Sequence, residues 1–508
     1  RGAFESELVF VNIRYYDDSL PASAKGDLVV ASPAIIDGLN YIFQYADSVG
    51  KPAVVNLSWG MHTGPHDGTS LFDLAIDNLT GPGKIFVGAA GNSGWSRTHI
   101  SAKLQGDTLR TLPFNNRNVR DDVEDMYIDL WGSSGTSFSI SLGLADTNGF
   151  VIQMTDFIPT TKDTVIDGML RVPNIDFTED TLRYILSIVS SNAGNGKPNM
   201  LMELFNQTPQ TRRTVLYVYS DSSEVHAWNS GQIYSWGNGG FAAAFWGHPN
   251  IPGFTGGNAT YVVGENGGTG KSTITVGAYN ASKTTTGIDG NEIPGGWGNF
   301  ALFSSQGPTV DGRMKPDIAA PGETVISAYN RNAYRINQRG DIVDTVVWNG
   351  FTHYWGVASG TSMASPNACG VIALFLQADS TLTPDQIRSI LSQTATLDDM
   401  TVGAPGNAWG WGKINAYGGL LHIQNKLGVR QDSDHPRLSI YPNPGKNHFT
   451  LWGIEEDLPF QIVDVQGKVV SEGRIVESQL EVNLKPGLYF VRLMTPSGMH
   501  SLRLQITP

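Results

Sequence analysis

The stretch Gly360-Thr361-Ser362-Met363-Ala364-Ser365-Pro366 decides how this sequence folds. Small residues beside Ser362 permit a tight turn into a helix, and the nearly all-apolar run that continues to Leu376 is typical of a helix buried in a large core. Such a helix would aim its first backbone N–H groups, and the positive end of its dipole, at negative charge that forms near the serine. Taken alone, the motif is also compatible with an ordinary helix N-cap formed by Thr or Ser.

Two blocks upstream predict buried strands that end in turns. The first is Pro52-Ala53-Val54-Val55-Asn56-Leu57-Ser58-Trp59-Gly60, which on its own is a core strand ending in glycine. The second is Ile85-Phe86-Val87-Gly88-Ala89-Ala90-Gly91-Asn92, where the ordinary alternative for Asn92 is a turn asparagine in the left-handed conformation. An asparagine at the end of a rigid strand is also a neutral donor that needs no reorganisation when negative charge forms beside it.

Further blocks frame the serine motif. They are Phe-Ser-Ser-Gln-Gly-Pro at 303–308, Lys-Pro-Asp-Ile-Ala-Ala-Pro-Gly at 315–322 and Trp-Gly-Trp-Gly-Lys-Ile-Asn-Ala at 409–416. We expect the first two to have a structural role, building the turns that position the serine helix. Thr383-Pro384-Asp385-Gln386 predicts the start of another helix, with Thr at the N-cap, Pro at the first position and Gln at the third.

In this order, the blocks resemble those of the subtilisin-like serine proteases, or subtilases. The resemblance covers residues 1–96 and about 259–427, and it implies an α/β fold with a parallel sheet flanked by helices. It implies that Ser362 is the catalytic nucleophile and that Asn92 donates its side-chain amide to the oxyanion. It further implies that an extended peptide binds by strand addition along one wall of the cleft. The residues implied in substrate binding are Ser58, Trp59, Gly60, Gly360 and Thr361.

A subtilase also needs a histidine that takes the proton of the serine and an aspartate that orients the histidine. In the family these two residues precede the nucleophile, in Asp-Thr/Ser-Gly and His-Gly-Thr-His blocks, and neither block occurs in this sequence. Residues 1–11 resemble the strand that follows the histidine helix, so we expect both residues in a segment upstream of Arg1. The four histidines nearest to the motifs do not match the family's base, and we expect them to be solvated or locally hydrogen-bonded. These are His62, His66, His99 and His353.

The resemblance therefore implies a secreted serine endopeptidase that hydrolyses polypeptides through an acyl-enzyme on Ser362, with this chain inactive alone. The alternative is a catalytically inactive pseudoprotease that binds peptides or a partner protein. No cofactor is expected for the reaction. Subtilases often carry structural calcium, but no run of closely spaced carboxylates assigns a position to it.

Composition sets wider bounds. A length of 508 residues with 40% hydrophobic content allows two to four folded domains. The formal net charge of −13 argues against nucleic acid or an acidic membrane as a partner. The single cysteine, Cys369, excludes an intrachain disulfide and is expected to be a small core residue. No apolar run approaches the roughly 20 residues of a membrane-spanning helix.

An insertion of short alternating strands separates the two parts of the subtilase resemblance, at residues 97–258. The pattern predicts an antiparallel β-sandwich, and its placement is similar to the jelly-roll insert in the Csp proteases of spore-forming clostridia. Trp131, Trp228 and Trp236 could form a sugar-binding platform. Sandwich core is the more frequent place for such aromatics, and we favour a rigid brace against the protease core.

A second module closes the chain. Residues 428–437 are polar and predict a linker. Residues 438–508 predict a small β-sandwich with alternating strands, and Leu438-Ser439-Ile440-Tyr441-Pro442-Asn443-Pro444 opens it. The module resembles the C-terminal sorting domain of the type IX secretion system. That resemblance implies the secretion machinery as a partner, and a location outside or on the surface of a bacterium of the Bacteroidetes type.

Overall fold

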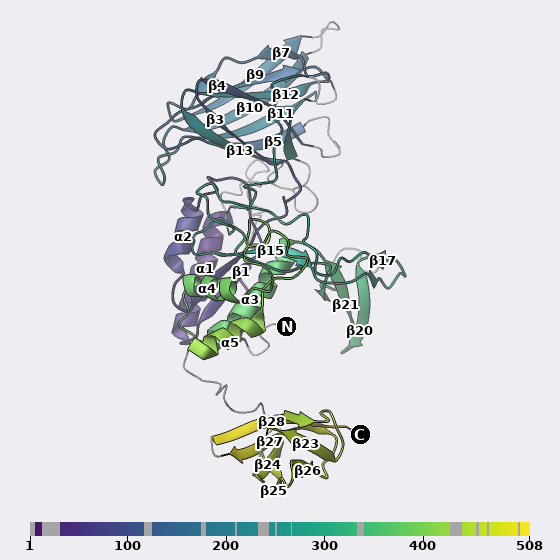
Figure 1. Ribbon diagram of the computed structural model, residues 1–508. Coiled ribbons are helices and arrows are strands. Elements are labelled where there is room, and N and C mark those ends of the chain that lie inside the picture. The colour runs from purple at the N-terminus through teal and green to yellow at the C-terminus, as the bar shows by residue number, and fades with distance from the viewer. Residues whose placement is uncertain are drawn as a thin grey trace. The chain divides into compact units, whose positions relative to one another are not determined.

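The computed structural model describes residues 6–12, 31–115, 124–173, 179–208, 211–231, 243–248, 251–265, 267–332, 340–426, 439–453, 457–464, 467–495 and 498–507. The chain divides into two compact units, residues 1–423 and 424–508 (Figure 1). The predicted linker at 428–437 lies outside the described residues. No helix among the described residues is long and apolar enough to cross a membrane.

A four-stranded parallel sheet is the centre of the first unit. Its strands lie in the order β1 (Ala53–Leu57), β2 (Lys84–Ala89), β15 (Ile274–Asn280) and β18 (Ile318–Glu323). The strands are nearly continuous apolar runs, as expected of a parallel sheet that is covered on both faces. The sheet confirms the α/β fold that the sequence predicts.

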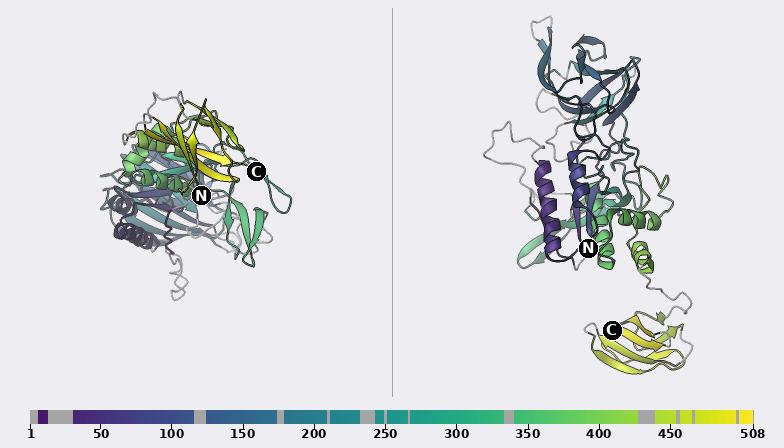
Figure 2. Two further views of the ribbon diagram at one scale, coloured as in Figure 1. Left: turned by 90° about the horizontal axis from the view of Figure 1, so that it is seen from below. Right: turned by 90° about the vertical axis from the view of Figure 1, so that its left-hand side faces the viewer.

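Helices cover the two faces of this sheet. On one face lie α1 (Ala31–Ser48) and α2 (Leu71–Leu79), the purple helices that stand side by side in the right-hand view of Figure 2. On the other face lie α3 (Thr361–Ala378), α4 (Pro384–Thr394) and α5 (Ala416–Lys426). The side chains of β2 alternate accordingly, because Phe86 packs among α1 and α2 whereas Ile85 and Val87 pack towards α3.

Local signals explain where these helices begin. Ser70 precedes α2 and its side chain accepts a hydrogen bond from the backbone N–H of Asp73. Helix α4 begins with the full capping box between Thr383 and Gln386, and Pro384 is its first residue. These caps satisfy backbone donors that a helix leaves free at its N-terminus. The start predicted for α4 is confirmed.

The insert forms two antiparallel sheets that share one hydrophobic core. Their strand orders are β3-β13-β5-β11-β10-β9 and β14-β4-β12-β6-β7, and β8 pairs with β6. The predicted inserted β-sandwich is therefore present. The strands are β3 (His99–Leu104), β4 (Asp107–Asn115), β5 (Glu124–Trp131), β6 (Ser139–Ala145), β7 (Val151–Met154), β8 (Ile158–Pro159), β9 (Thr164–Pro173), β10 (Glu179–Val189), β11 (Asn199–Asn206), β12 (Arg213–Ser220), β13 (Ser223–Gly231) and β14 (Ala243–Trp246).

The glycan-platform alternative fails for Trp131 and Trp228, the two described tryptophans that the sequence suggested for it. Trp228 has no exposed surface, and Trp131 is only 8% exposed. The indole N–H of Trp131 donates to Asp129, and that of Trp228 donates to the backbone oxygen of Tyr261. Both rings therefore lie inside the molecule, where they cannot stack on a sugar. Trp236 lies outside the described residues.

Two small sheets lie between β15 and the serine helix. One pairs β16 (Thr285–Thr286) with β17 (Glu292–Ile293). The other has the order β19 (Val325–Tyr329), β21 (Phe351–Ala358) and β20 (Ile342–Trp348). Strand β21 runs directly into the turn that carries the serine motif (Figure 1).

The second unit is a small β-sandwich with its own core, as predicted. One sheet contains β22 (Ser439–Tyr441), β23 (His448–Trp452) and β26 (Gln479–Glu481). The other contains β25 (Val469–Arg474), β24 (Pro459–Asp464), β27 (Gly487–Thr495) and β28 (Gly498–Ile506).

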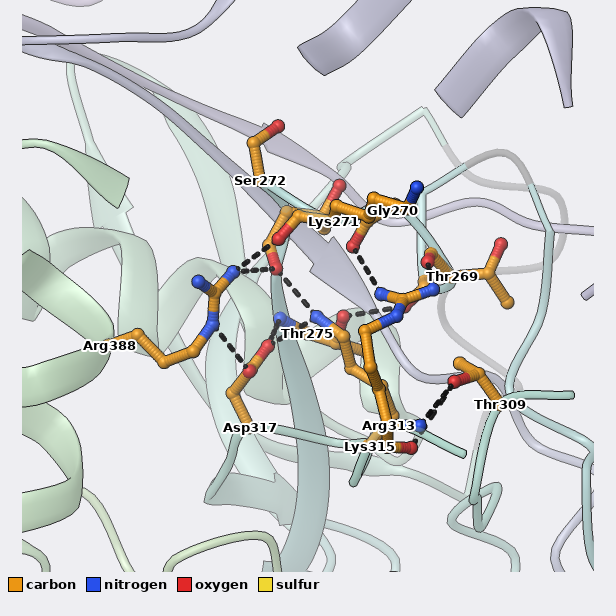
Figure 3. A network of polar contacts seen from close by, with 12 residues as sticks. Thr269, Gly270, Lys271, Ser272, Thr275, Thr309, Arg313, Lys315, Asp317 and Arg388 are labelled. Atoms are coloured by element: carbon orange, nitrogen blue, oxygen red, sulfur yellow. Dashed lines mark hydrogen bonds and ion pairs between the residues drawn. The ribbon is translucent and has the colours of Figure 1, made fainter. Parts of the chain in front are cut away.

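A buried ionic network ties α4 to the parallel sheet (Figure 3). Asp317 accepts hydrogen bonds from Lys315 Nζ at 2.6 Å, from Arg388 Nε at 2.9 Å and from the backbone N–H of Thr275 at 2.7 Å. Burial alone would raise the pKa of the Asp317 carboxyl, but Lys315 and Arg388 together outweigh it and hold that pKa below its ordinary value. The 315–322 block thus has structural contacts of the kind expected from the sequence.

Candidate active site

The serine motif forms a tight turn at the N-terminus of α3. Gly360 immediately precedes the helix with φ 150° and ψ 156°, a conformation that favours glycine. A Cβ atom at this position would lie 3.4 Å from Asn92 Nδ2. No side chain caps the helix, so the ordinary Thr or Ser N-cap is not what the motif forms. Ser362 lies in the first helical turn, where backbone N–H groups lack partners within the helix.

Asn92 is held beside this turn by its side-chain oxygen. Asn92 Oδ1 accepts from the backbone N–H of Thr361 at 2.9 Å and from Thr361 Oγ1 at 3.1 Å. Thr361 Oγ1 in turn accepts from the backbone N–H of Gly91 at 3.0 Å. Because Oδ1 is committed to Thr361, the orientation of the amide is fixed. Among the described residues no hydrogen bond uses Asn92 Nδ2, so both of its N–H groups remain available.

The left-handed alternative for Asn92 is wrong. The residue with positive φ in this turn is Gly91, at 106°, and not Asn92. Glycine makes the turn, and asparagine is free to present its side chain. The sequence assigned Thr361 to substrate binding only, and it missed the role of this residue in orienting Asn92.

A chain of small polar side chains joins the first strand block to α3. Ser58 Oγ donates to the backbone oxygen of Ser362 at 2.8 Å and lies 3.1 Å from Ser365 Oγ. Asn56 Nδ2 donates to Ser58 Oγ at 3.0 Å. Ser362 Oγ donates to the backbone oxygen of Ser58 at 3.4 Å. The predicted cleft wall and the serine are therefore in direct contact.

Trp59 and Gly60 continue this wall. The Trp59 side chain packs against the cluster formed by α1, α2 and Phe86, so its ring belongs to that face of the sheet. Gly60 approaches another backbone closely, because a Cβ atom there would lie 3.0 Å from the oxygen of Glu265. The next residue, Met61, pairs with Glu265 in both directions.

Within the described part of the chain, no histidine or carboxylate is hydrogen-bonded to Ser362. His62 contacts Ser93, His66 contacts the backbone oxygen of Val263, and His99 contacts Asn258 and His226. His353 lies on β21, with its ring near that of Trp348. These partners of the first three histidines are 31 to 197 residues away in the chain, so these bonds are not the local ones that the sequence led us to expect.

Among the described residues, the cysteine and the possible metal ligands add no further reactive group to the site. Burial raises the pKa of the Cys369 thiol to about 12, which makes it a poor nucleophile at neutral pH. Over the described ranges, no group of three or more His, Cys, Asp or Glu side chains is placed to hold a metal ion.

Comparison with protein families gives two matches. Residues 188–412 match the Subtilase family, and residues 439–507 match the Secretion system C-terminal sorting domain. The first match contains the serine motif but begins inside the insert. The second coincides with the small C-terminal sandwich.

Individual relatives are similar over part of their length. Serine protease AprX of Bacillus subtilis (strain 168) is 35% identical over 150 residues, which cover 29% of this chain and 30% of AprX. Bacillopeptidase F of the same organism is 33% identical over 131 residues, covering 25% of this chain and 8% of that protein. The matched segment thus spans less than a third of either relative.

A solved structure shares the fold over a longer stretch. The structure of the Clostridium perfringens CspB protease covers 78% of this chain and 72% of its own, with a TM-score of 0.56 and 18% sequence identity. At this identity the likeness concerns the fold.

Proposed function

We propose that this chain, which carries a subtilase domain and a secretion-system sorting domain, is the nucleophile-bearing part of a secreted serine endopeptidase. Ser362 Oγ would attack the carbonyl carbon of a peptide bond and form an acyl-enzyme, which water then hydrolyses. Asn92 Nδ2 and the backbone N–H of Ser362 would stabilise the oxyanion of each tetrahedral intermediate. The reaction as proposed needs no cofactor.

The observation that carries the proposal is the fixed amide of Asn92. Its oxygen is bound twice by Thr361, at 2.9 and 3.1 Å, while its nitrogen has no hydrogen bond among the described residues. A donor that is oriented before the reaction loses no energy to reorganisation when the oxyanion forms. An asparagine with a purely structural role would be expected to use both ends of its amide.

The sequence contains no motif for the general base of the reaction. We propose that a histidine, oriented by an aspartate, comes from a segment upstream of Arg1 in the same precursor. It would take the proton from Ser362 Oγ during attack and give it to the leaving amine, and the same cycle with water would release the acyl group.

A pseudoprotease is the second candidate. It is favoured by one observation: the hydrogen bond of Ser362 Oγ goes to a backbone oxygen, at 3.4 Å, and not to a base. In that case the cleft wall at Ser58–Gly60 would bind an extended peptide without cutting it.

The C-terminal sandwich supports a location outside the cell. A sorting domain of this type would be read by the type IX secretion machinery, which makes that machinery a partner and polypeptides outside the cell the substrates. We propose that the insert is a jelly-roll sandwich, which its two antiparallel sheets around one core and its place in the chain support.

The test uses the protein as isolated from the cells that make it, with peptide mapping by mass spectrometry. We expect upstream peptides that contain an aspartate block and a His-Gly-Thr-His-like block, joined to this chain or copurifying with it. In that complete enzyme Ser362→Ala should abolish peptide hydrolysis, whereas Ser392→Ala on α4 should leave it unchanged. Full turnover by Ser362→Ala would rule out this site. Peptide binding without turnover by the complete wild-type protein would establish the pseudoprotease.

A further inference from the structure

A stack of aromatic rings connects the insert to the catalytic half of the first unit. Trp228 of β13 has no exposed surface and lies parallel to His66, with 4.0 Å between ring centroids and 12° between planes. His66 in turn stacks on His62 at 5.6 Å and 19°. The two histidines belong to the segment that follows the predicted cleft wall. One ring of the insert and two rings of the core thus form a continuous column, in which Trp228 and His66 are buried and His62 is half-buried.

Hydrogen bonds fix the inner two rings of this column to one short segment. His66 Nδ1 donates to the backbone oxygen of Val263 at 2.8 Å, so the ring carries a proton on Nδ1. Trp228 Nε1 donates to the backbone oxygen of Tyr261 at 2.8 Å. The same segment donates from Gly264 N to the oxygen of Ala90 at 2.9 Å. The rings are therefore anchored to backbone that touches the strand leading to Asn92.

The outer ring ends on the residue after Asn92. His62 Nε2 lies 2.9 Å from Ser93 Oγ, while its Nδ1 is buried without a hydrogen-bond partner. Burying an unprotonated ring nitrogen without a hydrogen bond costs less than burying an unpaired N–H. The neutral ring of His62 therefore carries its proton on Nε2 and donates it to Ser93 Oγ. The backbone N–H of Ser93 donates to Ser305 Oγ at 3.0 Å. The side chain of Ser93 is thus held by the column, and its backbone by the 303–308 block.

We propose that His62 is a positioning residue for Asn92, and that the column through His66 to Trp228 makes the placement of the insert part of the oxyanion geometry. The inference rests on the proposed function and extends it, because it gives the inserted sandwich a role in the reaction. The side chain of Asn92 accepts hydrogen bonds from Thr361, and its backbone continues directly into Ser93. Thr361 sets the rotation of the amide, and His62 sets the position of the backbone that carries it.

A purely structural role for the column makes a different prediction. If the rings only fill space, weakening them lowers stability and affects all catalytic groups alike. If they act through Asn92, their removal lowers kcat with little change in KM, because the oxyanion exists only after attack. Their effect must also vanish when Asn92 has no amide to position.

The kinetic test uses His62→Phe in the complete enzyme, which keeps an aromatic ring for stacking and removes the donor to Ser93. We expect kcat to fall between about 10- and 100-fold, the loss typical of a misplaced reacting or stabilising group, with KM unchanged. In an Asn92→Ala background the same substitution should change kcat less than about twofold, because a site without the donor has nothing left to misplace. Ser93→Ala should reproduce the effect of His62→Phe. Equal losses with and without Asn92 would overturn the inference.

A second measurement does not depend on hydrolysis. This chain is labelled with ¹⁵N-asparagine, and the side-chain amide signal of Asn92 is assigned by its loss in Asn92→Gln. His62→Phe should shift or broaden that signal. Phe138→Leu, which weakens the insert core at a fully buried position away from the column, should leave it unchanged. An unmoved signal in His62→Phe would refute the positioning role even if the protease function holds, and a moved signal would support it even if the chain proves to be a pseudoprotease.

Discussion

Two buried polar regions of the first unit differ in how completely they are paired. Around Asp317, the carboxylate binds the ammonium of Lys315, the guanidinium of Arg388 and a backbone N–H (Figure 3). Around the loop that begins at Gly60, buried atoms lack hydrogen-bond partners among the described residues. They are Asn56 Oδ1 and His62 Nδ1. The buried carboxyls of Asp73 and Glu265, by contrast, share a side-chain hydrogen bond, and burial raises the pKa of both.

The two regions differ in how the cost of burying polar groups is offset. A buried charge is tolerated only where opposite charge and hydrogen bonds surround it, and the network of Asp317 meets that condition. An unpaired buried polar atom lowers the stability of the fold by about 1–3 kcal/mol, which other interactions must offset. Such atoms are retained where the arrangement of neighbouring groups matters more than local stability. Asn56 Oδ1 and His62 Nδ1 lie beside Ser58 and Ser93, whereas other such atoms, among them Thr111 Oγ1 and Thr208 Oγ1, lie in the insert.

The largest effect on stability is expected when the paired region loses its central charge. Asp317→Asn keeps the shape of the side chain and leaves Lys315, which is 2% exposed, without a counter-charge. We expect the free energy of unfolding to fall by about 3–5 kcal/mol, the range found when one partner of a buried ion pair is removed. Urea unfolding followed by tryptophan fluorescence measures it.

Asp385 provides the matched control, because it pairs with the same Arg388 but its side chain is 91% exposed. Asp385→Asn should lower stability by less than about 1 kcal/mol, as surface ion pairs do. If the two substitutions had equal effects, burial would not be what makes the Asp317 network structural.

The sequence predicted only part of the network around Asp317. The block at 315–322 predicted structural turns, and Thr383–Gln386 predicted the start of α4. That Arg388 would reach back 71 residues to Asp317 followed from neither, because a local motif does not specify which distant charge it meets.

The same limit on prediction from sequence applies more strongly to the candidate active site. Motifs placed Ser362 and Asn92 on a turn and at a strand end, because glycine and small residues have strong local preferences. The bond from Asn92 to Thr361 spans 269 residues, and the column brings in Trp228 from the insert. Sequence could favour a core position for Trp228 on residue type alone. Its actual neighbour, His66, is decided by the way in which the insert docks.

The proposed oxyanion donor should behave in the opposite way to Asp317. Asn92→Ala removes an amide that stabilises little in the resting protein, so stability should change by less than about 1 kcal/mol. In the complete enzyme kcat should fall about 10²–10³-fold, or about 2.7–4 kcal/mol, a magnitude known from the removal of such a donor in a subtilisin. Steady-state kinetics on a peptide substrate measures it.

Asn78 on α2 is a matched control, since its side chain donates only to the backbone oxygen of Leu74 at the surface. Asn78→Ala should leave kcat unchanged. A loss of less than about threefold for Asn92→Ala would show that the fixed amide has a structural purpose instead.

The smallest expected effect concerns the acid sensitivity of the buried histidine pair formed by His99 and His226. His99 Nδ1 donates to Asn258 Oδ1, so His99 Nε2 accepts from His226 Nδ1 at 3.0 Å. Burial lowers the pKa of His99 to about 4 and that of His226 to about 3, with further lowering of His226 by His99, Lys197 and Lys103. The carboxylate facing this pair is Glu224, 3.7 Å from His226 Nε2.

The sign of the pH dependence follows from the lowered pKa values. Between about pH 6.5 and pH 4 the unfolded chain binds protons on these histidines that the folded protein does not, so acidification destabilises the fold. Buried carboxyls work in the opposite direction, because burial raises the pKa of Asp129 and of Asp73 to about 6. The wild-type curve alone therefore mixes the two, and the contribution of one histidine must come from a difference between proteins.

His226→Phe isolates that contribution. Relative to wild type, the variant should gain about 1.4 kcal/mol of unfolding free energy per pH unit as the pH falls from about 6.5 to about 4, since one proton is no longer excluded. Urea unfolding of both proteins at pH 7.5, 6 and 5 gives the difference. Phe138→Leu is the control, because it changes a buried residue of the insert without removing a titratable group, and its curve should stay parallel to wild type. Parallel curves for His226→Phe as well would mean that His226 takes up its proton in the folded state, and that the junction between insert and core is polar enough to hold a charge.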